Sequence, residues 1–373
     1  MEIVIYIAIL FILYYFLQIA LLIYGNFKVK IFKPGNFNPE SKFSILIPFK
    51  DEEENLPFLL DSFSNLNYPK DLFELIFIND ASSDKSLQII NSWRFKNPYI
   101  QLTVLDNVIV SKSPKKDAIT RAQTIAKYSW ILTTDADCIF PENILDTYNS
   151  LLLQNQEKAF FIGGVKISSK GGFLNAYQHH DMASLQAVTI GSFGIDESFM
   201  CNGANLLYKK DLFKEINGYA GVNHVSSGDD VFLLQKVLSK DPNLVMYAKH
   251  PDLIVETQPV KSWNGLFSQR ARWAQKSKIY SSIYPKILGI TVLLANLSLV
   301  LGIFILFVNP IFGVLIICSK FFVDYFILKK YNLLNKVDFS LFLLSEIAYP
   351  FVLFITIFYI LSIKISWKNR IIN

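Results

Sequence analysis

The chain has 373 residues, of which 52% are hydrophobic, 15% aromatic and only 18% charged, and its mean hydropathy is positive. These values exceed the norm for soluble domains and predict a membrane protein. The formal charge of +5 is modest and comes without a dense basic stripe, so we expect no nucleic-acid partner and a better match to an anionic membrane surface.

Cysteine and histidine usage argues against a disulfide framework and against a structural metal centre. Cys138, Cys201 and Cys318 are far apart and lack metal-ligand spacing, which predicts reduced thiols in a cytosolic compartment. The pair His179–His180 has neither an HExxH pattern nor a cysteine partner. A solvated or packing role is therefore expected for both histidines.

The N-terminal segment is apolar. Residues 3–24 contain one polar side chain, Gln18, and about 20 such residues cross a hydrocarbon core of about 30 Å. Because a basic start and a small-residue cleavage site are missing, we interpret residues 1–25 as an uncleaved transmembrane anchor and residues 26–42 as a linker. Three lysines follow at once and place this end in the cytoplasm by the positive-inside rule: Lys28, Lys30 and Lys33.

Residues 43–258 have mixed polarity and predict a cytoplasmic α/β domain. Four apolar strands are expected, each followed by a turn and a helical pattern: 43–47 before Pro48, FELIFIND, IQLTVLDN and YSWILTTDAD. Buried strands that alternate with helices predict a largely parallel sheet. Ligands of such sheets bind at the carboxyl ends of the strands, where four acidic residues fall: Glu52, Asp80, Asp135 and Asp137.

Asp135 and Asp137 are the most informative of these residues. In an extended segment, two residues at i and i+2 point to the same side, and two carboxylates about 4 Å apart repel by roughly 4 kcal/mol at an effective dielectric near 20. A cation or a shared proton would relieve this repulsion; a capped strand end is the simpler alternative. No GxGxxG or GxxxxGK[ST] pattern is present, so a nucleotide held by carboxylates would need a divalent metal.

Two further segments carry charged residues in suggestive positions. Lys115 and Lys116 could approach a phosphate, although a solvated basic turn explains them equally well. In SSGDDVFLL, Asp229 and Asp230 stand before an apolar helix. One aspartate there could be an N-cap, and the other could be a general base that takes a proton from a hydroxyl.

Residues 259–286 contain SWNGLFSQRARW, which mixes basic and aromatic residues at helical spacing. An amphipathic interfacial helix explains the tryptophans and the charges but gives no reason for Gln269.

The C-terminal membrane region covers residues 287–363. Its apolar stretches are 287–308, 311–328 and 340–363, and the break at Asn309-Pro310 makes the first two a hairpin. The last stretch contains Glu346 and Pro350, and crossing would put the basic tail, residues 364–373, on the outside. Three and four spans therefore both remain open.

Seven ordered motifs resemble those of membrane-anchored, inverting family-two glycosyltransferases: ILIPFKDEEENL, FINDASSD, KKDAI, TTDADC, CNGANLLYKKDLF, SGDDVFLL and QRARW. The resemblance covers residues 43 to about 280. Within the family, the QRARW box is similar to that of cellulose and hyaluronan synthases and of ceramide glucosyltransferases. The family implies a Rossmann-like nucleotide-diphospho-sugar transferase fold and a UDP-linked hexose donor.

The resemblance also implies roles for individual residues. The residues implied for the nucleoside pocket are Pro48, Phe49, Glu52 and Asp80. Lys115 would approach the diphosphate, Asp135 the nucleotide and sugar, and Asp137 would ligate Mg²⁺ or Mn²⁺, with Asp135 beside it. Asp230 matches the catalytic base. Residues implied for the acceptor and the departing pyrophosphate are Gln269, Arg272 and Trp273.

Two positions depart from the family pattern. Asn79 replaces the more usual Asp beside Asp80. Asp229 replaces Glu beside the expected base, which leaves open which of the two aspartates acts.

The implied activity is metal-assisted transfer of a hexose to a hydroxyl of a lipid or glycan acceptor at the cytoplasmic face of the inner membrane. A processive polysaccharide synthase is one alternative, although the membrane segments offer little material for a polymer tunnel. A non-catalytic nucleotide-binding scaffold is another, against which the complete carboxylate set argues. A transporter is not expected, because intramembrane charges are few.

Overall fold

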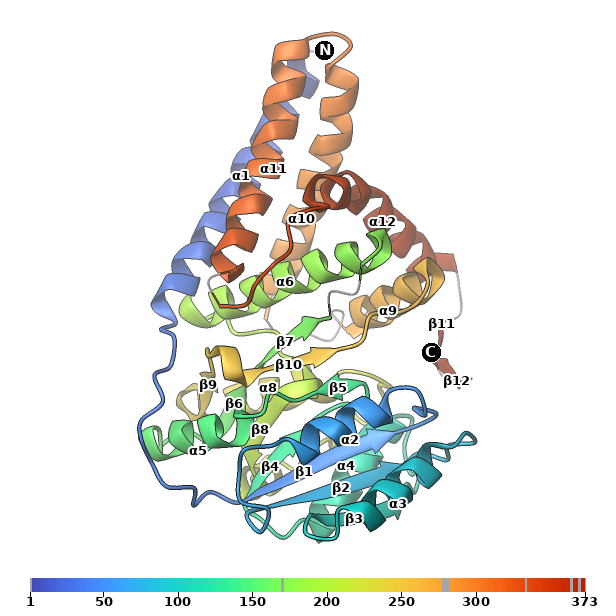
Figure 1. The fold of residues 1–373 in the computed structure, drawn as a ribbon. Helices are drawn as coiled ribbons and strands as arrows, with labels where there is room; N and C mark the ends of the chain where they lie inside the picture. Colours follow the sequence, from blue (N-terminus) through green and yellow to red (C-terminus); the bar gives the residue numbers. More distant parts are fainter. Residues whose placement is uncertain are drawn as a thin grey trace.

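The chain folds into an α/β region with a group of long apolar helices above it (Figure 1). The structure is a computed structural model that describes residues 2–168, 171–276, 282–332, 334–362, 365–367 and 370–372.

The centre of the α/β region is a seven-stranded sheet in the order β3-β2-β1-β4-β8-β6-β9. Its strands are β1 Phe43–Phe49, β2 Phe73–Asn79, β3 Gln101–Asp106, β4 Trp130–Thr133, β6 Phe160–Ile162, β8 Leu206–Lys209 and β9 Val245–Tyr247. β1 pairs with β2 and β4, and β2 with β3, all in parallel. β8 runs antiparallel to β4 and β6. The expected largely parallel α/β sheet is confirmed.

Helices cover both faces of this sheet. They are α2 Leu56–Ser64, α3 Ser86–Lys96, α4 Pro114–Ile125, α5 Ile144–Gln154, α7 Lys210–Glu215 and α8 Asp229–Lys240. In β1, Ile45 and Ile47 belong to the core that includes α2, while Leu46 between them belongs to the core that includes Ala118 of α4. The strand is therefore apolar without alternation because both of its faces are buried.

Pro48 lies inside β1, where the sequence predicted the strand to stop. The Leu46 carbonyl accepts a hydrogen bond from the Thr134 amide, 3.1 Å away, on the β4 side. Residues two apart in a parallel strand face the same neighbour, so the Pro48 nitrogen faces the same side. β4 has already ended at Thr133, so no sheet hydrogen bond is lost there and the proline is tolerated.

A second sheet of three strands lies between the main sheet and the long apolar helices (Figure 1). Its strands are β5 Cys138–Ile139, β7 Gly164–Ile167 and β10 Ile254–Thr257. Short 3-10 helices span Gly203–Asn205, Pro242–Leu244 and Pro251–Leu253. β10 pairs in parallel with β7 and antiparallel with β5, which carries the chain away from the main sheet directly after the Asp135–Asp137 segment.

In the part of the chain that the structure describes, four helices are long and apolar enough to cross a membrane. They are α1 Glu2–Lys28, α10 Tyr284–Ile305, α11 Pro310–Asn332 and α12 Phe342–Ser362. α10 and α11 form the predicted hairpin and run along α1, whereas α12 lies across them (Figure 1). A short hairpin of β11 Ile365–Trp367 and β12 Arg370–Ile372 lies in the predicted tail.

Two helices connect the α/β region to the membrane helices: α6 Phe173–Gly194 and α9 Trp263–Lys276. α6 contacts α1, α11 and α12, and α9 contacts α12. The contact between α6 and α1 is made by glycines: a Cβ on Gly191 would lie 2.4 Å from the carbonyl oxygen of Leu22. Within residues 173–194 the sequence predicted a solvated or packing role for His179 and His180 only, and both are buried in α6. No helix was predicted there, because the apolar residues follow no single face.

Candidate active site

Lys115 holds together two carboxylates from distant parts of the chain. Its ammonium nitrogen lies 2.6 Å from Oδ1 of Asp135 and 3.1 Å from Oδ2 of Asp229. Lys115 is in the first turn of α4, Asp135 follows β4, and Asp229 opens α8. The parallel order of the strands brings these three elements to the same edge of the sheet.

The charge of Lys115 is stabilised by these neighbours. Burial alone would lower the pKa of Lys115, but the carboxylates of Asp135 and Asp229 outweigh burial and raise it. The lysine is thus a permanent cation at neutral pH. It supplies part of the positive charge that the Asp135–Asp137 segment needs.

The Asp135–Asp137 segment is a turn, which corrects the expected extended geometry. β4 ends at Thr133, and the amide of Cys138 donates to the carbonyl of Asp135, 3.2 Å away. The chain turns here because β5 leaves to pair with β10. Strand alternation therefore does not make the two aspartates point to the same side. Both carboxylates nevertheless lie at the same edge of the sheet.

Asp229 and Asp230 begin α8, and neither is its N-cap. The N-cap is Gly228, whose φ of 80° is left-handed, so the simple capping interpretation is wrong. Asp230 is buried, and its two oxygens accept from the amide of Gly203 at 3.3 Å and from the amide of Val231 at 2.8 Å. The carboxylate is therefore fixed by backbone donors.

Gly203 allows this close approach. A Cβ at this position would lie 2.7 Å from Oδ2 of Asp229 and 3.6 Å from Cβ of Asp230. The Gly203 carbonyl accepts a hydrogen bond from Thr133, 3.0 Å away, which ties the CNGAN segment to the end of β4. The CNGAN motif was recognised in the sequence, but its contact with Asp229 and Asp230 was not predicted.

Arg272 of α9 faces the same cluster. Burial lowers the pKa of its guanidinium, and four carboxylates oppose that effect: Asp135, Asp229, Asp230 and Asp137. The QRARW segment therefore contributes a second cation to the site, opposite the sheet edge. Together Lys115 and Arg272 bring two positive charges to four negative ones.

The other predicted residues of α9 are arranged around Arg270. Its guanidinium lies 4.2 Å from the centre of the Trp273 ring, and its Nη1 donates to Oε1 of Gln269 at 3.4 Å. Arg270 also forms an ion pair with Asp181 of α6; the Asp181 side chain is buried and that of Arg270 is 12% exposed. From the sequence, Arg270 was expected among the interfacial charges and Asp181 had no predicted role, because nothing in the motif points to a partner on α6.

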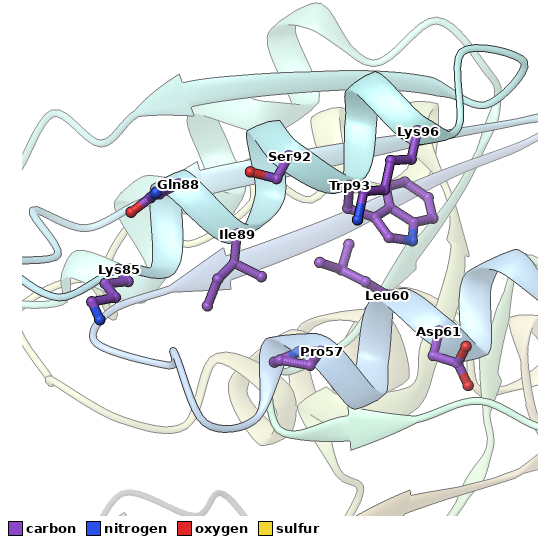
Figure 2. Close-up of a pocket in the computed structure, with 9 residues that line it drawn as sticks. All are labelled: Pro57, Leu60, Asp61, Lys85, Gln88, Ile89, Ser92, Trp93 and Lys96. Carbon is purple, nitrogen blue, oxygen red and sulfur yellow. The ribbon is translucent and has the colours of Figure 1, made fainter.

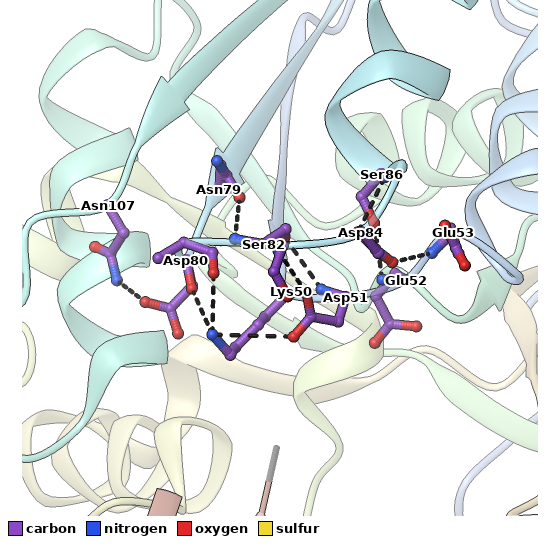
Figure 3. A network of polar contacts seen from close by, with 12 residues as sticks. Lys50, Asp51, Glu52, Glu53, Asn79, Asp80, Ser82, Asp84, Ser86 and Asn107 are labelled. Atoms are coloured by element: carbon purple, nitrogen blue, oxygen red, sulfur yellow. Dashed lines mark hydrogen bonds and ion pairs between the residues drawn. The ribbon is translucent and has the colours of Figure 1, made fainter. Parts of the chain in front are cut away.

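A second polar network joins the loops after β1 and β2 (Figure 3). The Asp51 amide donates to Ser82 at 3.1 Å, and the Glu53 amide donates to Asp84 at 2.9 Å. Asp51 and Ala81 both have positive φ, at 47° and 58°, so each loop turns sharply where the two loops meet.

Two of the predicted nucleoside residues belong to this network. The Glu52 amide donates to Ser86 at 2.8 Å, and the Glu52 carboxylate accepts from Asn55 at 2.7 Å. The buried carboxylate of Asp80 accepts from Asn107 at 2.9 Å, and Lys50 donates to the Asp80 carbonyl at 3.3 Å.

Asn107 connects the two networks, because its amide also donates to the carbonyl of Pro114, at 3.0 Å, beside Lys115. Of the other predicted nucleoside residues, Pro48 lies in β1 beside Ile78 of β2. Phe49 is buried, with its ring 6.1 Å from that of Phe77. Its side chain therefore belongs to the sheet core.

The residues at the end of β4 have the chemistry for a hard divalent cation. Within the described ranges, no group of three or more His, Cys, Asp or Glu side chains converges on one point. Mg²⁺, however, is commonly held by one or two carboxylates together with substrate phosphates and water. Asp135 and Asp137 provide two such carboxylates, so the residues fit a metal that is bound jointly with a phosphate ligand.

A surface groove of about 450 Å³ lies elsewhere, between α2 and α3 (Figure 2). Leu60, Ile89 and Trp93 form its floor, and Lys85 and Lys96 lie at its rim. None of the predicted site residues lines it.

Comparison with known proteins identifies a family. A family model described as glycosyl transferase family 21 matches residues 3–373. A probable glycosyltransferase, YdaM of Bacillus subtilis, is 26% identical over 243 residues, which are 64% of this chain and 56% of the relative. A poly-beta-1,6-N-acetyl-D-glucosamine synthase of Staphylococcus epidermidis is 25% identical over 62% of this chain and 53% of the relative. The chain thus spans about half the length of these relatives.

The fold also matches a solved structure. The mannosyltransferase PcManGT from Pyrobaculum calidifontis, in complex with GDP-Man and Mn²⁺, aligns with a TM-score of 0.57 over 96% of this chain and 99% of its own. The sequence identity is 14%. At that identity the match supports the glycosyltransferase fold and nothing finer.

Proposed function

The chain belongs to glycosyl transferase family 21, and from this premise we propose that it is an inverting glycosyltransferase of the membrane surface. The donor is a UDP-linked hexose and the acceptor is a hydroxyl of a lipid or glycan. The motifs resembled those of family-two glycosyltransferases, whereas the matching model is that of family 21. The predicted resemblance to membrane-anchored glycosyltransferases is confirmed.

One observation carries this proposal: Lys115 and Arg272 face the carboxylates of Asp135, Asp137, Asp229 and Asp230 at the carboxyl edge of a parallel sheet. Such an edge is where α/β folds bind ligands. Cations can hold a diphosphate there, and carboxylates can hold a metal and take a proton. Both kinds of group are needed for transfer from a nucleotide sugar.

In this proposal the UDP-sugar extends from the polar network around Glu52 and Asp80 to the carboxylate cluster around Lys115. Asp80 and Glu52, with the adjacent Pro48, would bind the nucleoside side, whereas the buried Phe49, predicted to line the same pocket, packs in the sheet core beneath them. Asn107 supports it, because its hydrogen bonds connect Asp80 to the residue before Lys115. Lys115 and Arg272 then lie where the diphosphate follows.

A divalent cation, Mg²⁺ or Mn²⁺, would be held by Asp137 and Asp135. When bound, it neutralises negative charge that collects on the diphosphate as the sugar leaves. Gln269 and Trp273, next to Arg272 on α9, would contact the acceptor.

Asp230 is the proposed general base. Asp229 is engaged by the ammonium of Lys115, whereas the carboxylate of Asp230 is oriented by the backbone amides of Gly203 and Val231. We therefore assign Asp229 to holding Lys115 and the oriented Asp230 to the acceptor hydroxyl. Asp230 takes the proton of the acceptor hydroxyl, the hydroxyl oxygen bonds to the anomeric carbon, and the bond from that carbon to the diphosphate oxygen breaks with its electron pair. Attack from the opposite face converts an α-linked donor into a β-linked product.

The position of the site supports a membrane-derived acceptor. α9, which carries Arg272, contacts α12, and α6 lies against α1 and α11. We propose the same division as predicted, into an anchor, linker, catalytic domain, interfacial segment and membrane region. The long apolar helices would lie in the cytoplasmic membrane, and the catalytic domain would face the cytoplasm. α6 adds a second interfacial helix inside residues 43–258.

A processive polysaccharide synthase is the second candidate, favoured by the polymer synthase among the relatives. Product length on a gel with labelled UDP-sugar separates the candidates: one added hexose supports the glycolipid product, and a ladder supports the polymer.

The test of the proposed function is a screen of UDP-linked and GDP-linked sugars in native membranes, with release of nucleotide measured with and without Mn²⁺. Nucleotide release with a UDP-hexose that depends on Mn²⁺ is expected. Release with GDP-sugars alone would contradict the uridine assignment. No release with any donor and acceptor would support a non-catalytic scaffold.

A further inference from the structure

A small cavity of about 130 Å³ lies where the last turn of α1 meets the end of α11, beside α6. Lys30, Lys249 and Lys330 line it, and no acidic residue does. At about 30 Å³ for each water, the cavity holds roughly four waters, which is also enough room for a phosphate group. It is separate from the carboxylate cluster of the candidate active site, because none of those residues lines it.

Lys249 is the buried member of the group, with a relative exposure of 6%. Its ammonium donates to the carbonyl of Asn26 at 2.7 Å, to Oδ1 of Asn26 at 2.9 Å and to the carbonyl of Val29 at 2.8 Å. These three acceptors are neutral and use all three N–H groups, so Lys249 contributes an unneutralised charge to the pocket, and Lys30 and Lys330 are the lysines that can donate to an anion. Burial, together with the positive charge of Lys330, lowers the pKa of Lys249 to about 8.

The other two lysines add to this excess positive charge. Lys330 Nζ lies 3.3 Å from the centre of the Phe27 ring, and Lys30 is exposed at the rim. Among the residues that the structure covers, no carboxylate forms an ion pair with any of the three lysines. A buried Lys249 ammonium beside the Lys330 cation, without a carboxylate partner, is costly, and a bound anion would lower that cost.

We propose that this lysine pocket binds the phosphate of an anionic membrane phospholipid. Phosphate oxygens accept charge-assisted hydrogen bonds from ammonium groups, and basic pockets between membrane helices at the cytoplasmic side are suited to anionic head groups. A free phosphate has the same chemistry. The lipid is favoured by the place of the pocket, at the ends of two helices long enough to span a membrane.

The surface beside the pocket supports the lipid as well. Phe27 and Ile31 are 65% and 46% exposed and could contact the acyl chains below a head group. The pocket also joins parts of the molecule, because the Lys249 carbonyl accepts from the amide of Phe32 in the linker at 2.8 Å. A bound lipid would therefore fix the junction between α1 and the α/β region. This inference does not depend on the proposed glycosyl transfer.

The test measures binding of phosphatidylglycerol, phosphatidylcholine and inorganic phosphate to the purified full chain in detergent, by native mass spectrometry. Lys330→Gln is compared with Lys329→Gln, which removes an exposed charge one residue away that does not line the pocket. We expect wild type to retain phosphatidylglycerol in preference to phosphatidylcholine. Lys330→Gln should weaken that binding about fivefold, and Lys329→Gln should change it less than about twofold.

Lys30→Gln provides a second variant, because the exposed Lys30 side chain can be replaced without disturbing the fold, and it should weaken lipid binding as well. Equal losses in Lys329→Gln and Lys330→Gln would overturn the pocket, since general surface charge would then explain binding. Inorganic phosphate that binds as tightly as phosphatidylglycerol would overturn the lipid assignment. Unchanged lipid binding in both Lys30→Gln and Lys330→Gln would overturn the proposal altogether.

Discussion

Lys115, at the start of α4, forms an ion pair of 2.6 Å with Asp135, in the turn after β4. The same ammonium reaches Asp229 at the start of α8. The cluster is therefore held in place by the protein's own charges, and a diphosphate that enters would compete with the carboxylates for the lysine. This relationship makes Lys115 the first residue to test.

Replacing Lys115 should weaken donor binding. Lys115→Met removes the cation while keeping most of the side-chain volume, and we expect KM for the UDP-sugar to rise at least about tenfold, as for a lost hydrogen bond to a charged group. Lys112→Met is the matched control, because Lys112 is exposed just before α4. A KM that stays at the wild-type value in Lys115→Met would argue against its contact with the diphosphate.

Asp137→Ala should remove the response to metal. We expect Mn²⁺-dependent transfer to fall by about 100-fold or more, since charge stabilisation of the leaving group is lost. The far-ultraviolet circular dichroism spectrum should not change. Asp211→Ala, at a side chain that is 82% exposed on α7, controls for the loss of a carboxylate as such. If Asp137→Ala shows the wild-type dependence on Mn²⁺, the metal role belongs to another residue.

The two aspartates of α8 should separate in their effects. Asp230→Asn should bind donor normally and lose turnover by about 100-fold to 10,000-fold, as expected for a general base. Asp229→Asn breaks the ion pair with Lys115, so its main effect should be on donor KM. Calorimetric binding and single-turnover rates for both variants distinguish these roles. Rapid turnover by Asp230→Asn, with a slow Asp229→Asn, would reverse the assignment.

A methyl group at Gly203 should disturb catalysis more than stability. The Cβ of Gly203→Ala would lie 2.7 Å from Oδ2 of Asp229, so the carboxylates must move, and a displacement of about 1 Å can cost about 100-fold in rate. Gly289→Ala in α10 is the control, because a Cβ there meets nothing within 4 Å. We expect kcat to fall in the first variant alone. Equal kcat values for both variants would contradict the close packing at Gly203.

The ion pair between Arg270 and Asp181 should position α9, including Arg272. Asp181→Asn leaves the Arg270 guanidinium, which is 12% exposed, without its charge partner, and Asp181→Glu retains the charge. If the pair acts by positioning, kcat should fall by about tenfold or more in Asp181→Asn at temperatures where it stays folded, with donor KM little changed, and recover in part in Asp181→Glu.

An exposed ion pair, between Lys261 and Glu54, provides the control for Asp181. Lys261→Gln breaks the ion pair with Glu54. The two side chains are 82% and 68% exposed, so the variant should have no measurable effect on kcat. If Asp181→Asn lowers only the melting temperature and leaves kcat unchanged, the Arg270–Asp181 pair is structural and does not position α9.

Much of the α/β region could be predicted from sequence because its strands are buried on both faces and end in acidic turns. β1, β2, β3 and β4 pair as expected. The predicted end of β1 was wrong. Pro48 continues the strand because β4 has already ended beside it. The turn at Asp135–Asp137 was also missed, because it depends on the pairing of β5 with β10, more than 100 residues away in the chain.

The candidate site was predicted as a set of residues but not as a set of contacts. Motifs identified Lys115, Asp229 and Arg272 one at a time, and no local pattern indicates that they share one cluster. The role of α6 was missed for the same reason: Asp181 matters through Arg270, and the glycines of α6 matter through α1. Such contacts between distant segments are set by tertiary packing and leave no periodic signal in the sequence.

The most direct test of the account is isothermal titration calorimetry of the purified full chain with a UDP-hexose, with and without Mn²⁺. Wild type should bind the nucleotide sugar with Mn²⁺ present and more weakly without it, and the double variant Asp135→Ala/Asp137→Ala should lose the difference. Absence of binding heat for every uridine diphosphate compound in the presence of Mn²⁺ would contradict the proposal that this carboxylate cluster holds a nucleotide sugar.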